Sequence, residues 1–334
     1  MLDEREPQPA EPRGAGGGRG WMWRAGLIAA AFAAPLFLND LWLYLLVIVN
    51  IWALLAVTWG FKIAVVGLID LGHAVFFGAG AYATAFLTTR FGVDPWLALA
   101  GSGFVAVLVG LVVALPALRL IGGYLAILTL AYSEAMRIFA TTARDYTGAE
   151  EGIRDIPPLL SSMGGNYLLT LGILVLSAAL LFLVRRSSWG ILLRSIKNDE
   201  EAAGVCGVNT SRYKIFALSL TAYLAGVGGS LYAAFFSITT PDVLAIALTG
   251  EALIIAHLGG EASIVGPPLG AALFILLTNQ LGFLEDYRLL VFSSVVLVLI
   301  YVMPQGIVPE LRNRLRRPWF PLPWRREKSS THLR

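Results

Sequence analysis

The chain has 334 residues, of which 57% are hydrophobic and only 14% are charged, and its mean hydropathy is +0.72. Soluble domains have about 25% charged and about 45–50% apolar residues, so this composition excludes an ordinary soluble fold. It predicts an integral membrane protein whose outer surface is solvated by lipid. The net charge of +3 indicates no broad basic surface for nucleic acid, and the single cysteine, Cys206, excludes an intrachain disulfide.

Apolar stretches along the chain predict an all-α polytopic transmembrane bundle of about ten spans, each near the ~20 residues that cross a hydrocarbon core. Two helices are predicted to be interrupted, the third by GLIDLGH at 67–73 and the ninth by VGPPLG at 265–270. The GVGGS run at 226–230 is predicted to be a helix-packing surface. The predicted spans are 24–38, 41–60, 64–89, 95–115, 121–141, 166–184, 213–237, 243–258, 262–283 and 287–303.

The basic residues predict which side of the membrane each loop faces. An even number of spans puts both termini on one side, and with the termini inside, 20 of the 25 Lys and Arg residues, Lys62 among them, lie on the inner side. Cytoplasmic loops carry the excess of basic residues. Both termini and the loop 185–212 are therefore predicted to be cytoplasmic, and the loop 142–165 is predicted to face outward.

The sequence predicts one transmembrane domain, residues 21–305, between two tails. Residues 1–20 are polar and rich in Pro and Gly, as in a disordered cytoplasmic tail, and residues 306–334 form a basic cytoplasmic tail. A cleaved signal peptide is the alternative for the start, with AAAFAAP at 29–35 as a weak cleavage site. The polar lead is long and partly acidic for a signal peptide.

A polar block at 194–214, RSIKNDEEAAGVCGVNTSRYK, separates two long apolar runs. Helical spacing over 189–203 predicts a short amphipathic helix that Gly204 and Gly207 end. Such a helix either docks into a groove of a soluble partner or rests on lipid headgroups. Acidic residues 199–201 favour a protein partner, because they gain nothing from an anionic membrane surface. The apolar side of this helix is Trp189, Leu192, Leu193, Ile196 and Ala203.

Four stretches resemble the LivM-type permeases, the membrane subunits of ABC importers for branched-chain amino acids and related solutes such as urea. The polar block and the helix after it resemble that family's Glu-Ala-Ala cytoplasmic loop. The other three stretches are GLIDLGHAVFFGAGAYATAFL (67–87), LPALRLIGGYLAILTLAYSEAMRIF (115–139) and TGEALIIAHLGGEASIVGPPLGAAL (249–273). The similarity covers roughly residues 40–305, with the stretches in the family's order.

The resemblance implies a set of partners in the cell inner membrane. These are a second homologous permease, two ABC ATPase subunits and a periplasmic or lipid-anchored solute-binding protein, working by alternating access. In the family, the Glu-Ala-Ala loop inserts into a cleft of the ATPase. That role falls on Glu201, Ala202, Ala203 and Gly207, which match the motif, with Leu192 and Ile196 on the apolar side of the same helix.

The chain carries no sequence motif for ATP hydrolysis. None of the lysines, at 62, 197, 214 and 328, completes the phosphate-binding pattern G-x-x-x-x-G-K-[ST]. ATP and Mg²⁺ are therefore expected on partner subunits, and this chain is predicted to be a permease without enzymatic activity, cofactor or metal. The alternative from another class is a stand-alone transporter driven by an ion gradient, with an intramembrane enzyme far behind it.

Charged groups inside the spans mark candidate sites, because each costs about 2.5–3.5 kcal/mol near the bilayer centre. Asp70, Gly72 and His73 flank the break in the third span, where a helix beginning near His73 would direct its positive end at a substrate carboxylate. Close helix packing is the alternative role for the small residues there. Glu251 either lines the same translocation pathway or binds between helices.

Two further charged pairs lie toward the predicted outer side. Glu134 and Arg137 are three residues apart on one helix face and can pair as a gate or as a structural ion pair. Glu150 and Glu151, in the outer loop, are predicted to contact the solute-binding protein through a polar, reversible surface. They belong to TGAEEGI at 147–153, where an Ala stands at the second Gly of the family's TGGxxGI stretch.

Overall fold

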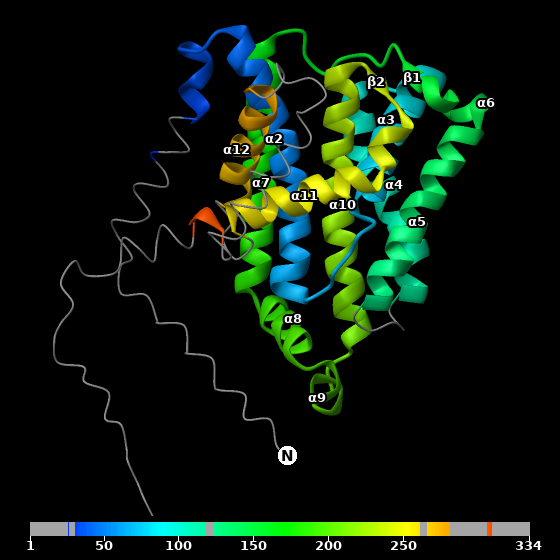
Figure 1. The fold of residues 1–334 in the computed structure, drawn as a ribbon, viewed down its shortest axis with the longest axis vertical. Helices are drawn as coiled ribbons and strands as arrows, with labels where there is room; N and C mark the ends of the chain where they lie inside the picture. Colours follow the sequence, from blue (N-terminus) through cyan, green and yellow to red (C-terminus); the bar gives the residue numbers. More distant parts are fainter. Residues whose placement is uncertain (1–25, 27–30, 118–122, 261–265, 281–305, 309–334) are drawn as a thin grey trace, which may run out of the picture.

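The computed structural model describes residues 26, 31–117, 123–260, 266–280 and 306–308, and this part of the chain is almost entirely helical. Figure 1 shows its long helices side by side, which confirms the all-α fold. The long helices are α2 (Asp40–Phe61), α3 (His73–Phe91), α4 (Pro95–Ala117), α5 (Gly123–Thr142), α7 (Met163–Arg186) and α10 (Thr210–Phe236). The shorter α-helices are α6 (Arg144–Thr147), α8 (Ser188–Asn198), α9 (Glu200–Val205), α11 (Ile246–Gly259) and α12 (Gly266–Gln280). Short turns and strands complete the chain: η1 (Ala34–Leu36), η2 (Lys62–Val66, π-helical), η3 (Ala149–Glu151), η4 (Pro241–Leu244), β1 (Ile153–Arg154) and β2 (Ile238–Thr239).

The long helices begin at polar caps that the sequence provides. The Asn39 side chain accepts a hydrogen bond from the backbone N–H of Trp42 at the start of α2, and Ser162 and Asn209 do the same for α7 and α10. Such caps satisfy backbone donors that have no partner within the helix. Each apolar run is thereby given a defined start.

The helices form two groups joined by α10 and α11. In one group α2 packs against α7 and α12, and in the other α3 packs against α4 and α10, with α5 beside them. Glycines bring α3 and α10 together: a Cβ on Gly229 would lie 2.8 Å from the Phe77 carbonyl carbon, and one on Gly80 would lie 2.5 Å from Cα of Gly226. The predicted packing role of the 226–230 run is confirmed.

Four described helices are long and apolar enough to cross a membrane: Asp40–Val66, Pro95–Val112, Met163–Arg186 and Thr210–Phe236. The ten-span prediction needs correction at 243–258. Helix α11 there has 14 residues, about 21 Å at ~1.5 Å per residue, which is shorter than a hydrocarbon core of about 30 Å. Figure 1 shows α11 lying across the bundle. The predicted span 287–303 and the tail residues 1–20 and 309–334 lie outside the described residues.

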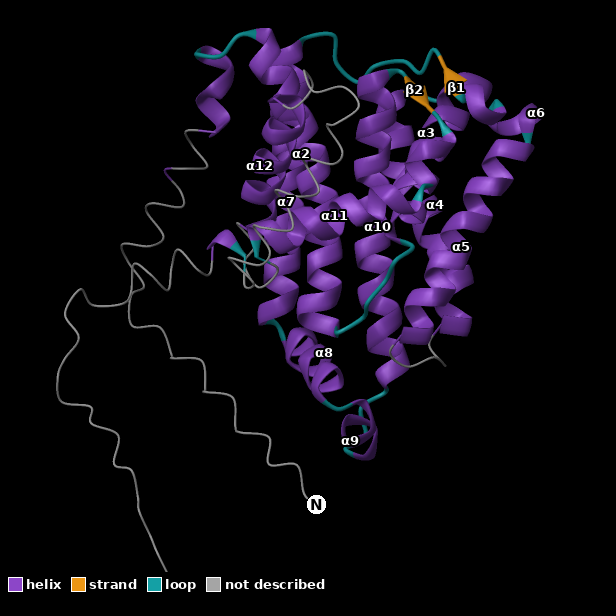
Figure 2. Cartoon of the chain, in the orientation of Figure 1, coloured by secondary structure: helices purple, strands orange, loops and turns teal. Residues whose placement is uncertain are grey.

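The two predicted loops lie at opposite ends of the bundle. Helices α8 and α9 form one end, and α6, β1 and β2 form the other (Figures 1 and 2). At the second end β1 pairs with β2 antiparallel, with Ile153 opposite Thr239. Ala149, at the position of the family's second Gly, has a φ of +53°, so this chain adopts a left-handed backbone conformation there without the glycine that favours it.

Candidate functional site

The break in the third predicted span is confirmed and has a local cause. After α2 the chain makes the π-helical turn η2 and stops at Gly67, whose φ of +77° is the left-handed conformation that commonly ends helices. Residues 68–72 then rise without helical structure to His73, where α3 begins (Figure 1). The third predicted span therefore has backbone polar groups in the interior of the bundle, and these need partners.

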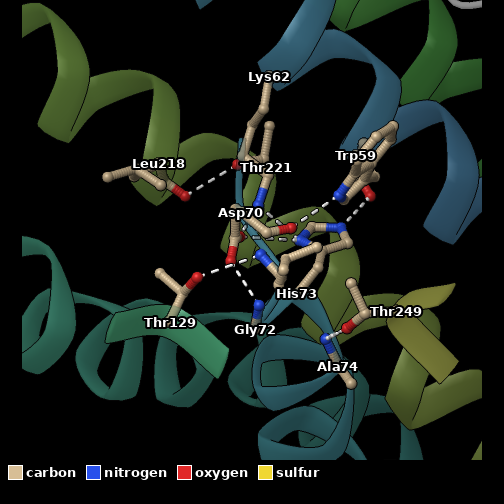
Figure 3. A network of polar contacts seen from close by, with 12 residues as sticks. Trp59, Lys62, Asp70, Gly72, His73, Ala74, Thr129, Leu218, Thr221 and Thr249 are labelled. Carbon is tan, nitrogen blue, oxygen red and sulfur yellow. Dashed lines mark hydrogen bonds and ion pairs between the residues drawn. The ribbon is translucent and has the colours of Figure 1, made fainter. Parts of the chain in front are cut away.

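A buried polar network fills this break (Figure 3). The ammonium of Lys62 forms an ion pair with the Asp70 carboxylate and lies 2.8 Å from Nδ1 of His73. Nε2 of His73 lies 2.9 Å from the hydroxyl of Thr58, which itself donates to the Leu55 carbonyl oxygen at 2.8 Å. Lys62 and His73 are 0% exposed and Asp70 is 2% exposed.

The hydrogen-bond partners of His73 determine which of its two ring nitrogens carries the hydrogen. An ammonium has only donors, so Nδ1 of His73 accepts from Lys62 and Nε2 carries the hydrogen that His73 donates to Thr58. With His73 neutral, the charges of Lys62 and Asp70 cancel, and every polar group of the three side chains has a partner. Full pairing of this kind is what allows a charged pair to be buried.

The start of α3 is closed by groups of the chain itself. Oδ1 of Asp70 accepts from the Gly72 N–H at 2.8 Å, the Leu71 N–H donates to the Thr129 hydroxyl at 3.1 Å, and the Ala74 N–H donates to the Thr249 hydroxyl at 2.9 Å. The sequence predicted a substrate carboxylate at this positive helix end. In the structure, that position is taken by the carboxylate of Asp70.

Lys62 is the member of the buried network that sequence reasoning misplaced. It was counted with the cytoplasmic basic residues, whereas the structure buries it completely. The inner count of Lys and Arg falls from 20 to 19 of 25 (20 − 1), and the sidedness of the loops and termini stays a prediction. The sequence did contain a signal for the burial of Lys62. Lys62 lies in an apolar stretch eight residues before Asp70, and a Lys inside a membrane needs a nearby carboxylate.

Glu251 lies between helices in the structure. Its Oε2 accepts a hydrogen bond of 2.7 Å from Nε1 of Trp52, which joins α11 to α2. The sequence left two roles open for Glu251, lining the pathway or binding between helices, and this contact corresponds to the second. A pathway role for Asp70, Gly72, His73 and Glu251 stays a prediction, and in this conformation Asp70 and His73 have almost no exposed surface.

Glu134 and Arg137 form the predicted pair on α5. Nη2 of Arg137 lies 2.5 Å from Oε1 of Glu134, and Nε donates to the same carboxylate. Their side chains are 39% and 36% exposed, respectively. Glu134 is the twelfth of the 20 residues of α5 (134 − 123 + 1), so the pair lies near the middle of this helix.

The segment predicted to be cytoplasmic consists of two helices, α8 and α9, which corrects the single helix predicted for 189–203. Asp199 has an extended backbone, with a φ of −157°, and its side chain accepts from the Ala202 N–H at 2.9 Å to cap α9. An Asp side chain can accept a hydrogen bond from a nearby backbone N–H, so Asp is more stable at a helix cap than inside a helix. Lys214 of α10 forms an ion pair of 2.5 Å with Glu200 and thereby ties α9 to the bundle.

Burial divides the predicted coupling residues into two sets. Ile196 and Ala203 are buried within the chain and Leu192 is half-buried. Glu201, Ala202 and Gly207 are exposed. The buried residues hold α8 and α9 against the rest of the chain. The exposed residues face solvent.

Together, the apolar helices and the buried charge network at a helix break are those of an integral membrane protein. Residues 41–303 match the family model of the permease component of branched-chain amino acid transport systems, and the chain belongs to this family. It is 29% identical over 279 residues to the high-affinity branched-chain amino acid transport system permease protein LivM of Salmonella typhimurium, covering 75% of this chain and 66% of that protein. It is 27% identical over 319 residues to LivM of Escherichia coli, covering 87% and 75%. No solved structure matches the chain.

Proposed function

We propose that this chain is a membrane subunit of an ABC importer that moves branched-chain amino acids, or related small solutes such as urea or short amides, across the cell inner membrane. Partner ATPases bind ATP and Mg²⁺ and drive alternating access. The observation that carries this proposal is the cytoplasmic segment. Ile196 and Ala203 are buried within the chain, whereas Glu201, Ala202, Val205 and Gly207 stay exposed at its tip, which is the arrangement of a docking helix.

The second permease subunit has a candidate place on α5. The ion pair of Glu134 and Arg137 is more than one-third exposed near the middle of this helix, and charged side chains at that depth face protein or water rather than lipid. We place this face of α5 toward the second permease and the translocation pathway between the two subunits. In this arrangement the pair can act as a gate.

The break at the start of α3 is the proposed inner part of the same pathway. Asp70, Gly72, His73 and Glu251 belong to it, closed by the chain's own hydrogen bonds in the present conformation. Reorientation would exchange some of these bonds for bonds to water or solute, as broken helices in transporters allow.

The solute-binding protein is proposed to contact the outer loop through Glu150 and Glu151, which are both exposed. We expect Glu150→Lys with Glu151→Lys to weaken the stimulation of ATP hydrolysis by the binding protein several-fold, because rim charges act mainly on association. The rate of ATP hydrolysis without binding protein should be unchanged. Unaltered stimulation in the double variant would place the contact elsewhere.

Uptake by reconstituted vesicles tests the proposed function against the ion-coupled alternative. Vesicles with both permeases, the ATPases and the binding protein should import radiolabelled leucine only when ATP is supplied. Vesicles that contain this chain alone should not accumulate leucine under a proton or sodium gradient. Gradient-driven accumulation by the chain alone would favour the secondary transporter, in which Asp70, Glu134 and Glu251 would carry the coupling ion.

A further inference from the structure

A direct contact joins the cytoplasmic segment to the end of α2. Nζ of Lys197, on α8, donates a hydrogen bond of 3.1 Å to the carbonyl oxygen of Ala64. Ala64 lies in the last turn before the chain leaves the helix at Gly67, where carbonyl groups lose their helical partners. Lys197 therefore acts as a cap supplied from another helix, in the way that basic side chains satisfy the last carbonyls of a helix.

The aliphatic stem of Lys197 packs closely against Gly67, although Lys197 is exposed to solvent on its other side. A Cβ on Gly67 would lie 2.7 Å from Cγ of Lys197 and 3.3 Å from its Cβ. Gly67 thus has two reasons to be glycine, its φ of +77° and the stem of Lys197 against it. A displacement of α8 must therefore move the π-helical turn or break the contact.

The same turn begins with Lys62, the cation of the buried network. Only one residue, Ile63, separates Lys62 from Ala64, so the turn connects the α8 contact to the Asp70 carboxylate and His73. Trp59 adds a second tie, because its Nε1 donates to the Asp70 carbonyl oxygen at 2.9 Å. The network and the end of α2 form one packed unit.

Beyond Asp70 the connection reaches two other helices. The Leu71 and Ala74 N–H groups donate to Thr129 of α5 and Thr249 of α11. A Cβ on Gly72 would lie 2.9 Å from the Thr129 carbonyl carbon, so the break touches the α5 backbone directly. Helix α5 also carries the exposed pair of Glu134 and Arg137.

We infer that Lys197 is a positioning residue for transport: its bond to Ala64, backed by Lys62, Asp70 and His73, transmits movement of α8 and α9 to the break at the start of α3 and to α5. This inference rests on the proposed function. It names the residues within this chain through which a docked ATPase would act on the membrane helices. Neither Lys197 nor Ala64 needs to touch the ATPase or the solute for this role.

The test is the number of ATP molecules hydrolysed per leucine imported, measured in vesicles with the complete complex. Lys197→Met keeps the aliphatic stem and removes the hydrogen bond. We expect uptake per ATP to fall several-fold while ATP hydrolysis and complex assembly persist, because Lys197 is exposed and a hydrogen bond for which water competes is worth a factor of about two to ten. Lys197→Arg, which can still donate to Ala64, should restore most of the coupling.

Arg194→Met is the matched control, because Arg194 is an exposed basic residue on the same helix. It should leave both rates unchanged. Wild-type coupling in Lys197→Met contradicts the inference, and so does a parallel loss of hydrolysis and assembly, which would assign Lys197 to docking. If the wild-type complex itself shows no ATP-dependent uptake, the proposed function fails. If the wild-type and Lys197→Met complexes import the same amount of leucine per ATP, only the inference about Lys197 fails and the proposed function stands.

Discussion

Lys62→Met should remove most of the folded protein, with a loss of about 3–5 kcal/mol in the free energy of unfolding. The substitution leaves the Asp70 carboxylate buried without its cation, and removing one partner of a buried pair costs about this much. It also removes the donor to Nδ1 of His73. The measurement is the temperature at which detergent-solubilised protein loses its monodisperse elution peak.

The double variant Lys62→Met with Asp70→Asn separates charge from packing. Asn keeps an oxygen for the Gly72 N–H and carries no charge, so the double variant should regain more than half of the lost stability. Arg194→Met, at an exposed position of α8, should change stability by less than about 0.5 kcal/mol. A Lys62→Met protein as stable as wild type would show that the buried ion pair does not hold the break together.

Gly229→Ala should destabilise the protein by about 2–3 kcal/mol, because the added methyl group has no space. Its Cβ would lie 2.8 Å from the Phe77 carbonyl carbon and 2.9 Å from the Ala81 nitrogen, which are both backbone atoms of α3. Helices α3 and α10 would have to move apart, and overpacking of this kind costs about 1–3 kcal/mol. The same thermal elution measurement detects the change.

Gly172→Ala on α7 is the control with the opposite sign. No atom lies within 4 Å of the Cβ that it would add, and Ala is favoured over Gly inside helices by about 1 kcal/mol. The protein should therefore unfold at a higher temperature. Equal effects of Gly229→Ala and Gly172→Ala would mean that the close approach of α3 and α10 contributes nothing.

Much of the fold could be predicted because membrane helices are recognisable in a sequence as long apolar runs. The apolar runs gave α2, α4, α7 and α10 nearly to their ends, and the Gly-Leu-Ile-Asp-Leu-Gly stretch located the break. The 243–258 stretch is equally apolar, yet its helix α11 lies across the bundle. Hydropathy reports that a helix is buried and does not report its direction, so this orientation was not predictable.

The candidate site was predicted in part. Asp70 and His73 stood out as charged or titratable groups inside an apolar segment, and Glu134 and Arg137 were paired correctly from their spacing. The partners of Asp70 and His73 were not predictable in the same way. Thr129 and Thr249 are distant in sequence and of an ordinary residue type, and only the folded chain brings them to the N–H groups at the start of α3.

The most direct test of the account is a photoreactive residue placed at Ala202 and, as a control, at its neighbour Ala203. Ala202 is exposed, whereas Ala203 is 7% exposed and packs into the chain. In native membranes, irradiation should join position 202 to an ATP-hydrolysing protein from the cytoplasmic side, with much less capture from position 203. Capture of lipid alone from position 202, or reaction from the outer face of the membrane, would contradict the claim that a partner ATPase drives this chain through α8 and α9.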